Sequence, residues 1–238
     1  MHIEVIGTAQ QCHTVDFKGK TAIVIDVLRA TSVIATALFH GAKAIIPAIS
    51  IEEAQAIYKS LEPGSAFLCG ERNANIIPGF HYGNSPLAFS PEVVHGKTLV
   101  LTTTNGTLAL RNTLEASQTL TASFLNISAV AELVSSQASD LVIVCAGTGG
   151  RFSLDDALCA GMLISLLNDH KKTETDDLGR LVLQFFGTDI GNISDKLAQC
   201  SHVKILQGKG FQHDIDFCLQ TSLFPIVPIL KGNYLMKS

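Results

Sequence analysis

The sequence lacks several features that mark whole classes of protein. It has no tryptophan and only three tyrosines among 238 residues, so it offers few aromatic surfaces on which the bases of single-stranded nucleic acid could stack. It also has no excess of basic residues: the formal net charge is −4 and the pI is about 6.0, whereas a general nucleic-acid-binding domain carries a basic face. We therefore expect no nucleic-acid partner.

Signals for membranes and export are missing as well. No apolar run approaches the roughly 20 residues that a membrane-spanning helix needs, and no basic segment followed by an apolar stretch and a cleavage site opens the chain. The six cysteines show no close pair typical of a zinc or thioredoxin-like site. These absences predict a cytoplasmic protein with no membrane partner, whose thiols are reduced and mostly buried.

What is present is a hydrophobic chain with alternating strand and helix patterns. Hydrophobic residues make up 47% of the sequence and charged residues 16%, which predicts extensive burial. Two stretches, near residues 19–60 and 96–135, share the order strand, polar loop, helix, strand, helix. This order predicts βαβ units and a largely parallel sheet. The likeness of the two stretches indicates either an internal duplication or the general similarity of any two βαβ units.

Four apolar runs of strand character end in loops rich in polar residues. The runs and their loops are Thr21–Ile25 before Asp26–Thr31, Ala66–Leu68 before Cys69–Arg72, Thr98–Leu101 before Thr102–Thr107, and Leu141–Val144 before Cys145–Arg151. In open α/β sheets, ligands bind beyond the carboxyl ends of the strands. We therefore expect the four loops to form one site.

The arginines point to the kind of ligand. The chain has five arginines, and three of them (Arg29, Arg72 and Arg151) lie in these four loops. The planar guanidinium suits phosphate, carboxylate and sulfonate oxygens. The pattern predicts a small substrate that carries several negative charges.

Each motif also has a purely structural interpretation. Asp26 could hold Mg²⁺, act as a base or cap the next helix, and Glu71 and Arg72 could form an ordinary surface ion pair. The Asn-Gly of Thr102–Thr107 is typical of a turn, although amides at a helix start also bind anions. The histidines show no ligand spacing, so we expect them to be structural or exposed.

The loop Cys145–Arg151 has the cysteine-to-arginine spacing of cysteine-dependent phosphatases, in which backbone amides hold phosphate and a thiolate attacks phosphorus. The next segment has two interpretations. Ser153 followed by Asp156 is a capping box that would account for Asp156 alone, whereas Asp155 would be free to face the site. Ser50 and Glu53 show the same capping pattern without chemistry nearby.

Taken together, the motifs resemble the 2-phosphosulfolactate phosphatase family. They are VIDVLRATSVIATAL (24–38), CGER (69–72), GNSP (83–86), TTTNGT (102–107), CAGTGGRFSLDDALCAG (145–161) and DIDFCLQ (214–220) before Val227-Pro228. The resemblance implies a single domain over residues 1–238 with a three-layer α/β/α fold. It also implies Mg²⁺-dependent hydrolysis of (2R)-phospho-3-sulfolactate, as in coenzyme M biosynthesis. Asn73 and His81 depart from the family pattern, in which Gly and Asp are common.

The resemblance and the motifs together define the expected site. The expected catalytic residues are Asp26, Arg29, Glu71, Arg72, Cys145 and Arg151. The expected substrate-binding residues are Thr31, Asn84, Ser85, Thr103, Thr104, Asn105, Gly106, Thr107, Gly147, Thr148 and Gly149. The expected Mg²⁺ ligands are Asp26, Glu71 and Asp155 or Asp156.

Several alternatives stay open at this stage. The attacking group is water, a carboxylate or Cys145. The chain could instead be a metal-free phosphatase that uses Cys145 and Arg151, or a non-catalytic protein that binds a phosphorylated or sulfonated metabolite. The sequence also leaves a homo-oligomeric state open.

Overall fold

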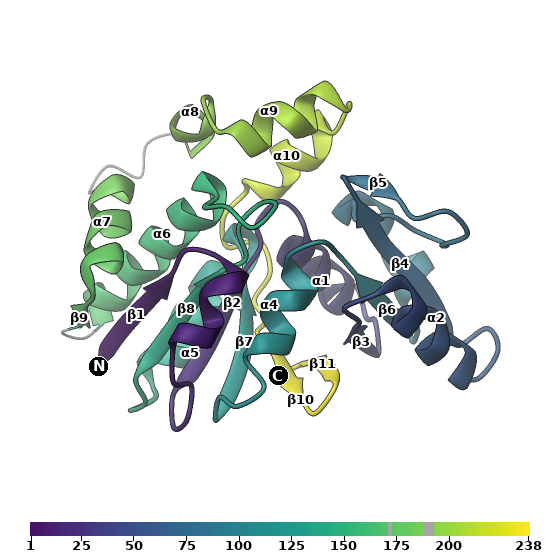
Figure 1. Ribbon diagram of the computed structural model, residues 1–238, viewed down its shortest axis with the longest axis horizontal. Helices are drawn as coiled ribbons and strands as arrows, with labels where there is room; N and C mark the ends of the chain where they lie inside the picture. Colours follow the sequence, from purple (N-terminus) through teal and green to yellow (C-terminus); the bar gives the residue numbers. More distant parts are fainter. Residues whose placement is uncertain (171–172, 188–192) are drawn as a thin grey trace.

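A computed structural model describes residues 1–170, 173–187 and 193–238. Its centre is a sheet of eleven described strands in the order β5-β4-β6-β3-β11-β10-β7-β2-β8-β1-β9 (Figure 1). The strands are β1 (His2–Ile6), β2 (Thr21–Ile25), β3 (Ala44–Pro47), β4 (Ala66–Arg72), β5 (Asn75–Ile76), β6 (Thr98–Thr102), β7 (Gln118–Ala122), β8 (Leu141–Cys145), β9 (Glu174–Thr175), β10 (Pro228–Lys231) and β11 (Tyr234–Lys237).

The helices lie between and around these strands. They are α1 (Ala30–Phe39), α2 (Ile51–Ser60), α3 (Pro91–Val94), α4 (Gly106–Asn112), α5 (Ile127–Ser135), α6 (Leu154–His170), α7 (Asp177–Phe186), α8 (Ile193–Leu197), α9 (Ser201–Gly208) and α10 (Gln212–Cys218), with short 3-10 turns η1 (Ala9–Thr14), η2 (Pro86–Ala88) and η3 (Phe124–Asn126). The predicted order of strand, helix, strand and helix is confirmed in both βαβ stretches. The run Leu178–Phe186, which fits either a strand or a helix, is helical in α7.

The sheet is mixed, with the predicted parallel pairing in two groups of strands. One parallel group contains β4, β6 and β3, and a second contains β7, β2, β8, β1 and β9. The hairpin of β10 and β11 joins the two groups through antiparallel pairing with β7 and β3. The chain's last strands therefore complete the centre of the sheet rather than its edge.

Helices cover both faces of the sheet. This covering buries the apolar side chains that point alternately to the two faces along each strand. On β2, Ile23 and Ile25 share a core with α5 and α6. The intervening Ala22 and Val24 share a second core with α1 and α4. Because successive strand side chains point to opposite faces, a strand buried on both sides reads as a continuous apolar run. The expected three-layer α/β/α architecture is confirmed.

The two βαβ stretches are arranged reciprocally. The first runs from β2 through α1 to β3, which lies in the other parallel group, and the second runs from β6 through α4 back to β7. Duplication itself remains a prediction, but the reciprocal crossing brings the loops after β2 and β6 to one place.

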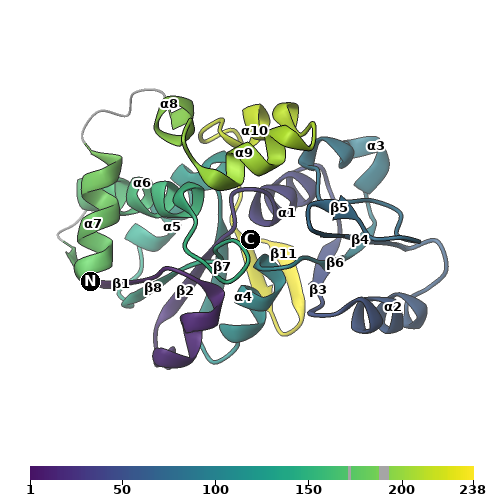
Figure 2. The same cartoon turned by 45° about the horizontal axis from the view of Figure 1, so that its top comes forward.

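The segment α8–α10 lies above the loops at the top of the sheet, and Figure 2 shows these helices across that end of the molecule. Contacts join α9 to both α6 and α10. Among the described residues, no helix combines the length and the apolar character needed to cross a membrane.

Candidate active site

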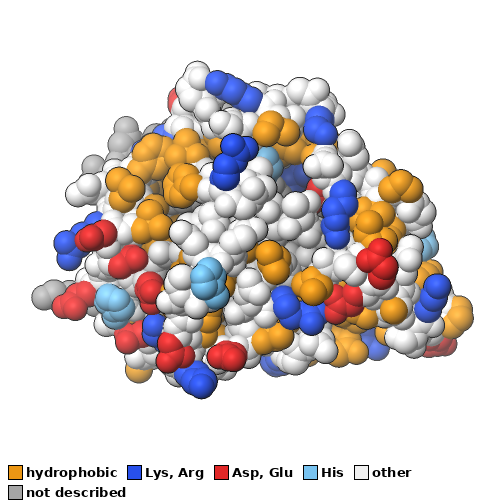
Figure 3. Space-filling model, in the orientation of Figure 1, with side chains coloured by type: hydrophobic (Ala, Val, Ile, Leu, Met, Phe, Trp, Pro, Cys, Tyr) orange, Lys and Arg blue, Asp and Glu red, His pale blue; other side chains and the backbone are white. Residues whose placement is uncertain are grey.

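A pocket of about 280 Å³ lies where the predicted loops meet. Eight of the expected site residues line it: Asp26, Arg29, Glu71, Asn84, Thr104, Asn105, Thr148 and Gly149. They follow or end β2, β4, β6 and β8, with Asn84 on the connection before η2. Figure 3 shows the surface hollowed between the α9 region and the β4–β5 region. Their functional roles stay predictions.

Asp26 stands directly after β2 and is 7% exposed. Its Oδ1 accepts the backbone N–H of Ala30 at 3.2 Å in the first turn of α1. Burial raises the pKa of the Asp26 carboxyl to about 6, although the hydrogen bond from Ala30 acts to lower it. Asp26 is therefore a carboxyl group that is costly to ionise in this pocket without a cation beside it.

Threonines repeat one hydrogen-bond pattern at both helix starts. The hydroxyl of Thr31 accepts from the N–H of Asp26 at 3.1 Å and donates to its carbonyl at 2.8 Å. The hydroxyl of Thr107 does the same with Thr103, at 3.2 and 3.0 Å. Thr31, Thr103 and Thr107 do not line the pocket. In the structure, their hydrogen bonds fix the shape of the two loops. That they bind substrate stays a prediction.

Gly106 lets the two helix starts approach each other. A Cβ added there would lie 2.5 Å from Oδ2 of Asp26 and 2.7 Å from Cβ of Ala30. Both distances are far below van der Waals contact, so a side chain at this position would displace the carboxylate. Gly106 therefore acts by leaving space rather than by touching the pocket.

Glu71 at the end of β4 is 8% exposed and is held by three donors. Its Oε1 accepts the N–H and the hydroxyl of Thr104, both at 2.9 Å, and its Oε2 accepts the N–H of Ala74 at 2.7 Å. Asn73 and Ala74 form the turn into β5 with φ of 53° and 63°. Glycine and asparagine are the residues that most readily adopt such values, which explains how Asn73 can replace the glycine of the family pattern.

The second departure, His81, also keeps a structural role. Its Nδ1 accepts the N–H of Leu68 at 3.0 Å, and its ring packs against Tyr58 and Phe67. An aspartate carboxylate could accept the same hydrogen bond. The structure places His81 outside the pocket lining.

The three arginines expected at one pocket are separated. Arg29 lines the pocket, but it also pairs with Asp214 at 2.5 Å, donates to the carbonyl of Ala74 at 3.2 Å and stacks on the ring of Phe211. Arg72 instead donates to the carbonyl of Glu71 at 2.7 Å and to the hydroxyl of Thr102 at 3.0 Å. Arg72 therefore supports β4 and β6 in the structure and does not line the pocket, and its catalytic role stays a prediction.

Arg151 lines a second, adjacent hollow of about 450 Å³ rather than the first. Thr148 and His202 line both hollows and so stand between them. The cysteine-to-arginine spacing does not bring Arg151 to the carboxylates, because Thr148 and Arg151 close a tight turn through paired backbone hydrogen bonds of 2.8 and 3.1 Å. Gly147 lies inside this loop, where its N–H is bound to Asp156.

Sequence reasoning missed the face of α9. His202, Ile205, Leu206 and Lys209 line the pocket, and their spacing of three and four residues is that of one helical face. Lys209 also donates to the carbonyl of Asn73 at 2.6 Å. The signal was present as helical periodicity, but nothing in the sequence shows that this short helix crosses the strand ends.

Asn84 carries an unsatisfied acceptor. Its side chain is 6% exposed, and its Oδ1 has no hydrogen-bond partner among the described residues. Buried polar atoms are rarely left unpaired, so this oxygen is suited to a ligand or cation in the pocket. The hydroxyl of the neighbouring Ser85 donates to Asp214 at 2.7 Å, and its contact with substrate stays a prediction.

Asp155 and Asp156 do not join the other carboxylates. Asp156 accepts the N–H groups of Val27 and Gly147, both at 2.9 Å, and so ties the loops after β2 and β8 together. This role replaces the predicted capping box. Asp155 faces the hydroxyl of Ser153 and the ring of His202. In residues 1–170, 173–187 and 193–238, no three His, Cys, Asp or Glu side chains are placed to hold one metal ion together.

Cys145, one of the three candidate attacking groups, is buried in the core. It is 1% exposed at the end of β8 and belongs to the apolar core shared with α6. Burial raises the pKa of its thiol well above the ordinary value, and the charges of Asp156 and Asp155 add to the effect. Since the thiolate is the attacking form, this thiol is inert in the structure.

Comparison with known proteins agrees with the motifs. The chain matches the family described as 2-phosphosulpholactate phosphatase over residues 6–233. A protein of Caldanaerobacter subterraneus subsp. tengcongensis named "probable 2-phosphosulfolactate phosphatase" is 42% identical over 238 residues, which are 100% of this chain and 99% of that protein. Proteins of the same name from Thermotoga maritima (44% identical, 92% of each chain) and Clostridium perfringens (40% identical, 95% of this chain and 92% of that one) also match. Over nearly its whole length, then, this chain belongs to the 2-phosphosulpholactate phosphatase family of phosphoric monoester hydrolases.

Proposed function

We propose that this protein is a Mg²⁺-dependent phosphatase that converts (2R)-phospho-3-sulfolactate to sulfolactate and phosphate, as in coenzyme M biosynthesis. The observation that supports this most is the joint lining of one pocket by the carboxylates of Asp26 and Glu71 and by the cationic side chains of Arg29 and Lys209. A phosphate, a carboxylate and a sulfonate on one small molecule match such a mixture of charges.

Asp26 and Glu71 are the residues that would hold Mg²⁺. This ion usually binds through one or two carboxylates and retains several waters, so two carboxylates suffice and the absence of a third does not count against it. The unsatisfied Oδ1 of buried Asn84 supplies a further oxygen donor in the same pocket. When bound, the ion would neutralise charge on the phosphoryl oxygens.

The other lining groups would orient the substrate. Arg29 and Lys209 would bind its anionic groups, and the hydroxyl of Thr104 and the amide of Asn105 would donate to its oxygens. Phosphoryl transfer needs mainly positioning and charge neutralisation, which these side chains provide. Water is the attacking group in this proposal, because the thiol of Cys145 is buried in the core.

Release of inorganic phosphate tests the proposal. Phosphosulfolactate with Mg²⁺ is expected to give steady phosphate release that stops when a chelator removes the ion and resumes when Mg²⁺ returns. Asp26→Asn should abolish release, whereas the matched variant Asp16→Asn, at an exposed position, should not change it. Phospholactate, which lacks the sulfonate, should be a poorer substrate.

Each alternative predicts a different result. Activity that survives the chelator but is lost in Cys145→Ala would establish the metal-free mechanism instead. Binding of phosphosulfolactate without any phosphate release would establish a non-catalytic binding protein. Equal turnover of phospholactate would show that the sulfonate is not recognised.

A further inference from the structure

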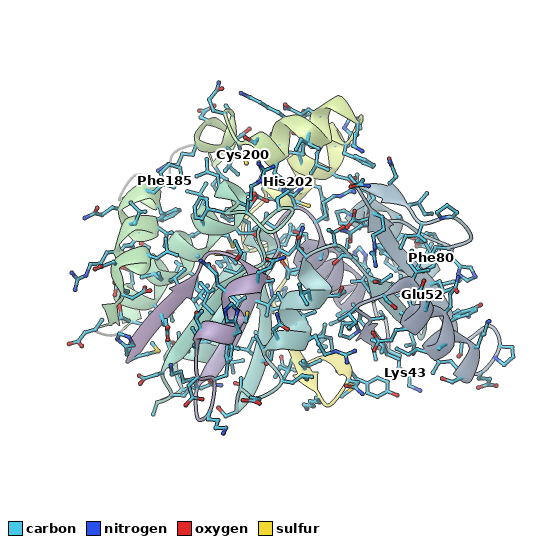
Figure 4. All side chains as sticks on the ribbon, in the orientation of Figure 1. Lys43, Glu52, Phe80, Phe185, Cys200 and His202 are labelled. Atoms are coloured by element: carbon cyan, nitrogen blue, oxygen red, sulfur yellow. The ribbon has the colours of Figure 1, made fainter. Side chains whose placement is uncertain are left out.

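A buried acid–histidine pair lies beside the pocket and has no part in the function proposed above. Nδ1 of His202 on α9 lies 3.4 Å from Oδ2 of Asp155 in the first turn of α6. The Asp155 side chain is 1% exposed and that of His202 is 16% exposed. His202 and Cys200, two residues before it, are labelled in Figure 4, where they lie at the α9 end of the molecule above the sheet.

Asp155 is held so that it faces the imidazole. Its other oxygen, Oδ1, accepts from the hydroxyl of Ser153 and lies 3.8 Å from the thiol of Cys200. With Oδ1 engaged, Oδ2 remains for His202. A carboxylate that orients a histidine in this way sets which ring nitrogen faces outward. Because Nδ1 faces Asp155, Nε2 is the nitrogen left for the pocket.

His202 lines the pocket together with Asp26, Arg29 and Lys209. Nδ1 of His202 and Oδ2 of Asp155 are both buried and neither has a hydrogen-bond partner among the described residues, so they face each other as an ion pair. Burial acts to lower the pKa of the imidazole, but the nearby carboxylate of Asp155 outweighs it, and the charge of Asp26 adds to it against that of Arg29. The net effect raises the pKa of His202, which favours the protonated ring that a general acid needs. The second hollow, whose lining residue Phe152 is 49% exposed, gives the ring a route to solvent for taking up a new proton.

We infer that His202 is the general acid of the phosphatase reaction, with Asp155 as its positioning residue. This inference rests on the proposed function. As the bond between phosphorus and the ester oxygen breaks, the leaving oxygen takes the proton from Nε2 and departs as the alcohol. The attacking water forms the new P–O bond, and the proton that it loses remains with the phosphate product or passes to solvent. His202 then regains a proton from solvent.

The test compares two leaving groups. In His202→Ala, kcat for phosphosulfolactate is expected to fall by about 10²–10⁴-fold, the usual contribution of a general acid, with little change in KM. With p-nitrophenyl phosphate, whose phenolate leaves without a proton, kcat should fall much less. The matched control His213→Ala, at an exposed position of α10, should leave both activities unchanged, and thermal melts should show that the variants are folded.

A second variant tests the pair through pH. Asp155→Asn removes the carboxylate that keeps the imidazole protonated, so the alkaline limb of kcat for phosphosulfolactate should move to lower pH. This readout does not require the aryl ester to be a substrate. A purely structural role of the pair would lower kcat without moving the limb.

Three results would overturn the inference: equal losses on both substrates, a change confined to KM, or an unmoved alkaline limb in Asp155→Asn. If the wild-type enzyme is active, any of these results shows that His202 is not the general acid and leaves the proposed function unaffected. If the wild-type enzyme releases no phosphate from phosphosulfolactate, the proposed function has failed instead.

Discussion

Asp26→Asn is expected to make the metal-free protein more stable at alkaline pH while it removes activity. In the folded state, burial raises the pKa of the Asp26 carboxyl from 3.8 to about 6. A carboxyl with a raised folded pKa stabilises the fold fully below its unfolded pKa, and this contribution is lost as pH rises through the folded pKa. At alkaline pH, folding therefore keeps an ionised carboxylate in a place where it is disfavoured.

The pKa values set the size of the effect. A difference between 3.8 and about 6 corresponds to about 3 kcal/mol, since each pKa unit is worth about 1.4 kcal/mol. Asparagine has the same shape, and its amide oxygen can still accept the N–H of Ala30. The expected gain is about 1–3 kcal/mol at pH 8, because the new amide N–H₂ also needs a partner.

Urea unfolding with a chelator present measures this gain. The two proteins should differ at about pH 8 and converge at about pH 4, where the wild-type carboxyl is protonated. Asp155→Asn is a matched contrast, because His202 holds the pKa of the Asp155 carboxyl below its usual value although burial opposes this; that variant should lose stability. A less stable Asp26→Asn at alkaline pH, or a difference independent of pH, would refute the reasoning.

Three further substitutions test other parts of the structure. Gly106→Ala should lower kcat by about 100-fold, because its Cβ would lie 2.5 Å from the Asp26 carboxylate and a misplacement of about 1 Å can cost that much. Asp214→Ala should lower the free energy of unfolding by about 3–5 kcal/mol in urea, because it leaves the buried guanidinium of Arg29 without its partner. Cys145→Ala should leave kcat nearly unchanged in the phosphate-release assay, because the thiol lies in the core.

Each of these three predictions has a control variant or an outcome that would contradict it. Gly208→Ala, where an added Cβ meets nothing within 4 Å, should keep full activity. Lys20→Met breaks a more exposed ion pair with Glu4 and should cost at most about 1 kcal/mol. A fully active Gly106→Ala, an Asp214→Ala variant no less stable than Lys20→Met, or a folded but inactive Cys145→Ala would each contradict the corresponding account.

The local pattern of the sequence was sufficient for the elements and for half of the pocket. Continuous apolar runs such as Thr21–Ile25 predict strands buried on both faces, and polar residues directly after such runs predict a site at the strand ends. Glu71 and Thr104 lie together for this reason, because the parallel strands β4 and β6 end at the same edge of their group. Asp26 follows β2 in the other parallel group, and the crossing of the two βαβ stretches brings it beside them. Ser50 caps α2 through the N–H of Glu53 at 3.0 Å, as its motif predicts.

Tertiary structure alone decided which charged groups line the pocket. The sequence shows that Arg72 and Arg151 lie in loops at strand ends. The direction in which each side chain points depends on partners far along the chain, such as Thr102 for Arg72. In the same way Asp155 turned to His202, 47 positions away in the sequence, rather than to Asp26. A local motif does not predict such distant partners, because they come close only when the helices and strands pack together. The alternation of strands and loops therefore determined where the pocket forms, and the crossing of α9 over those loops determined what lines its other side.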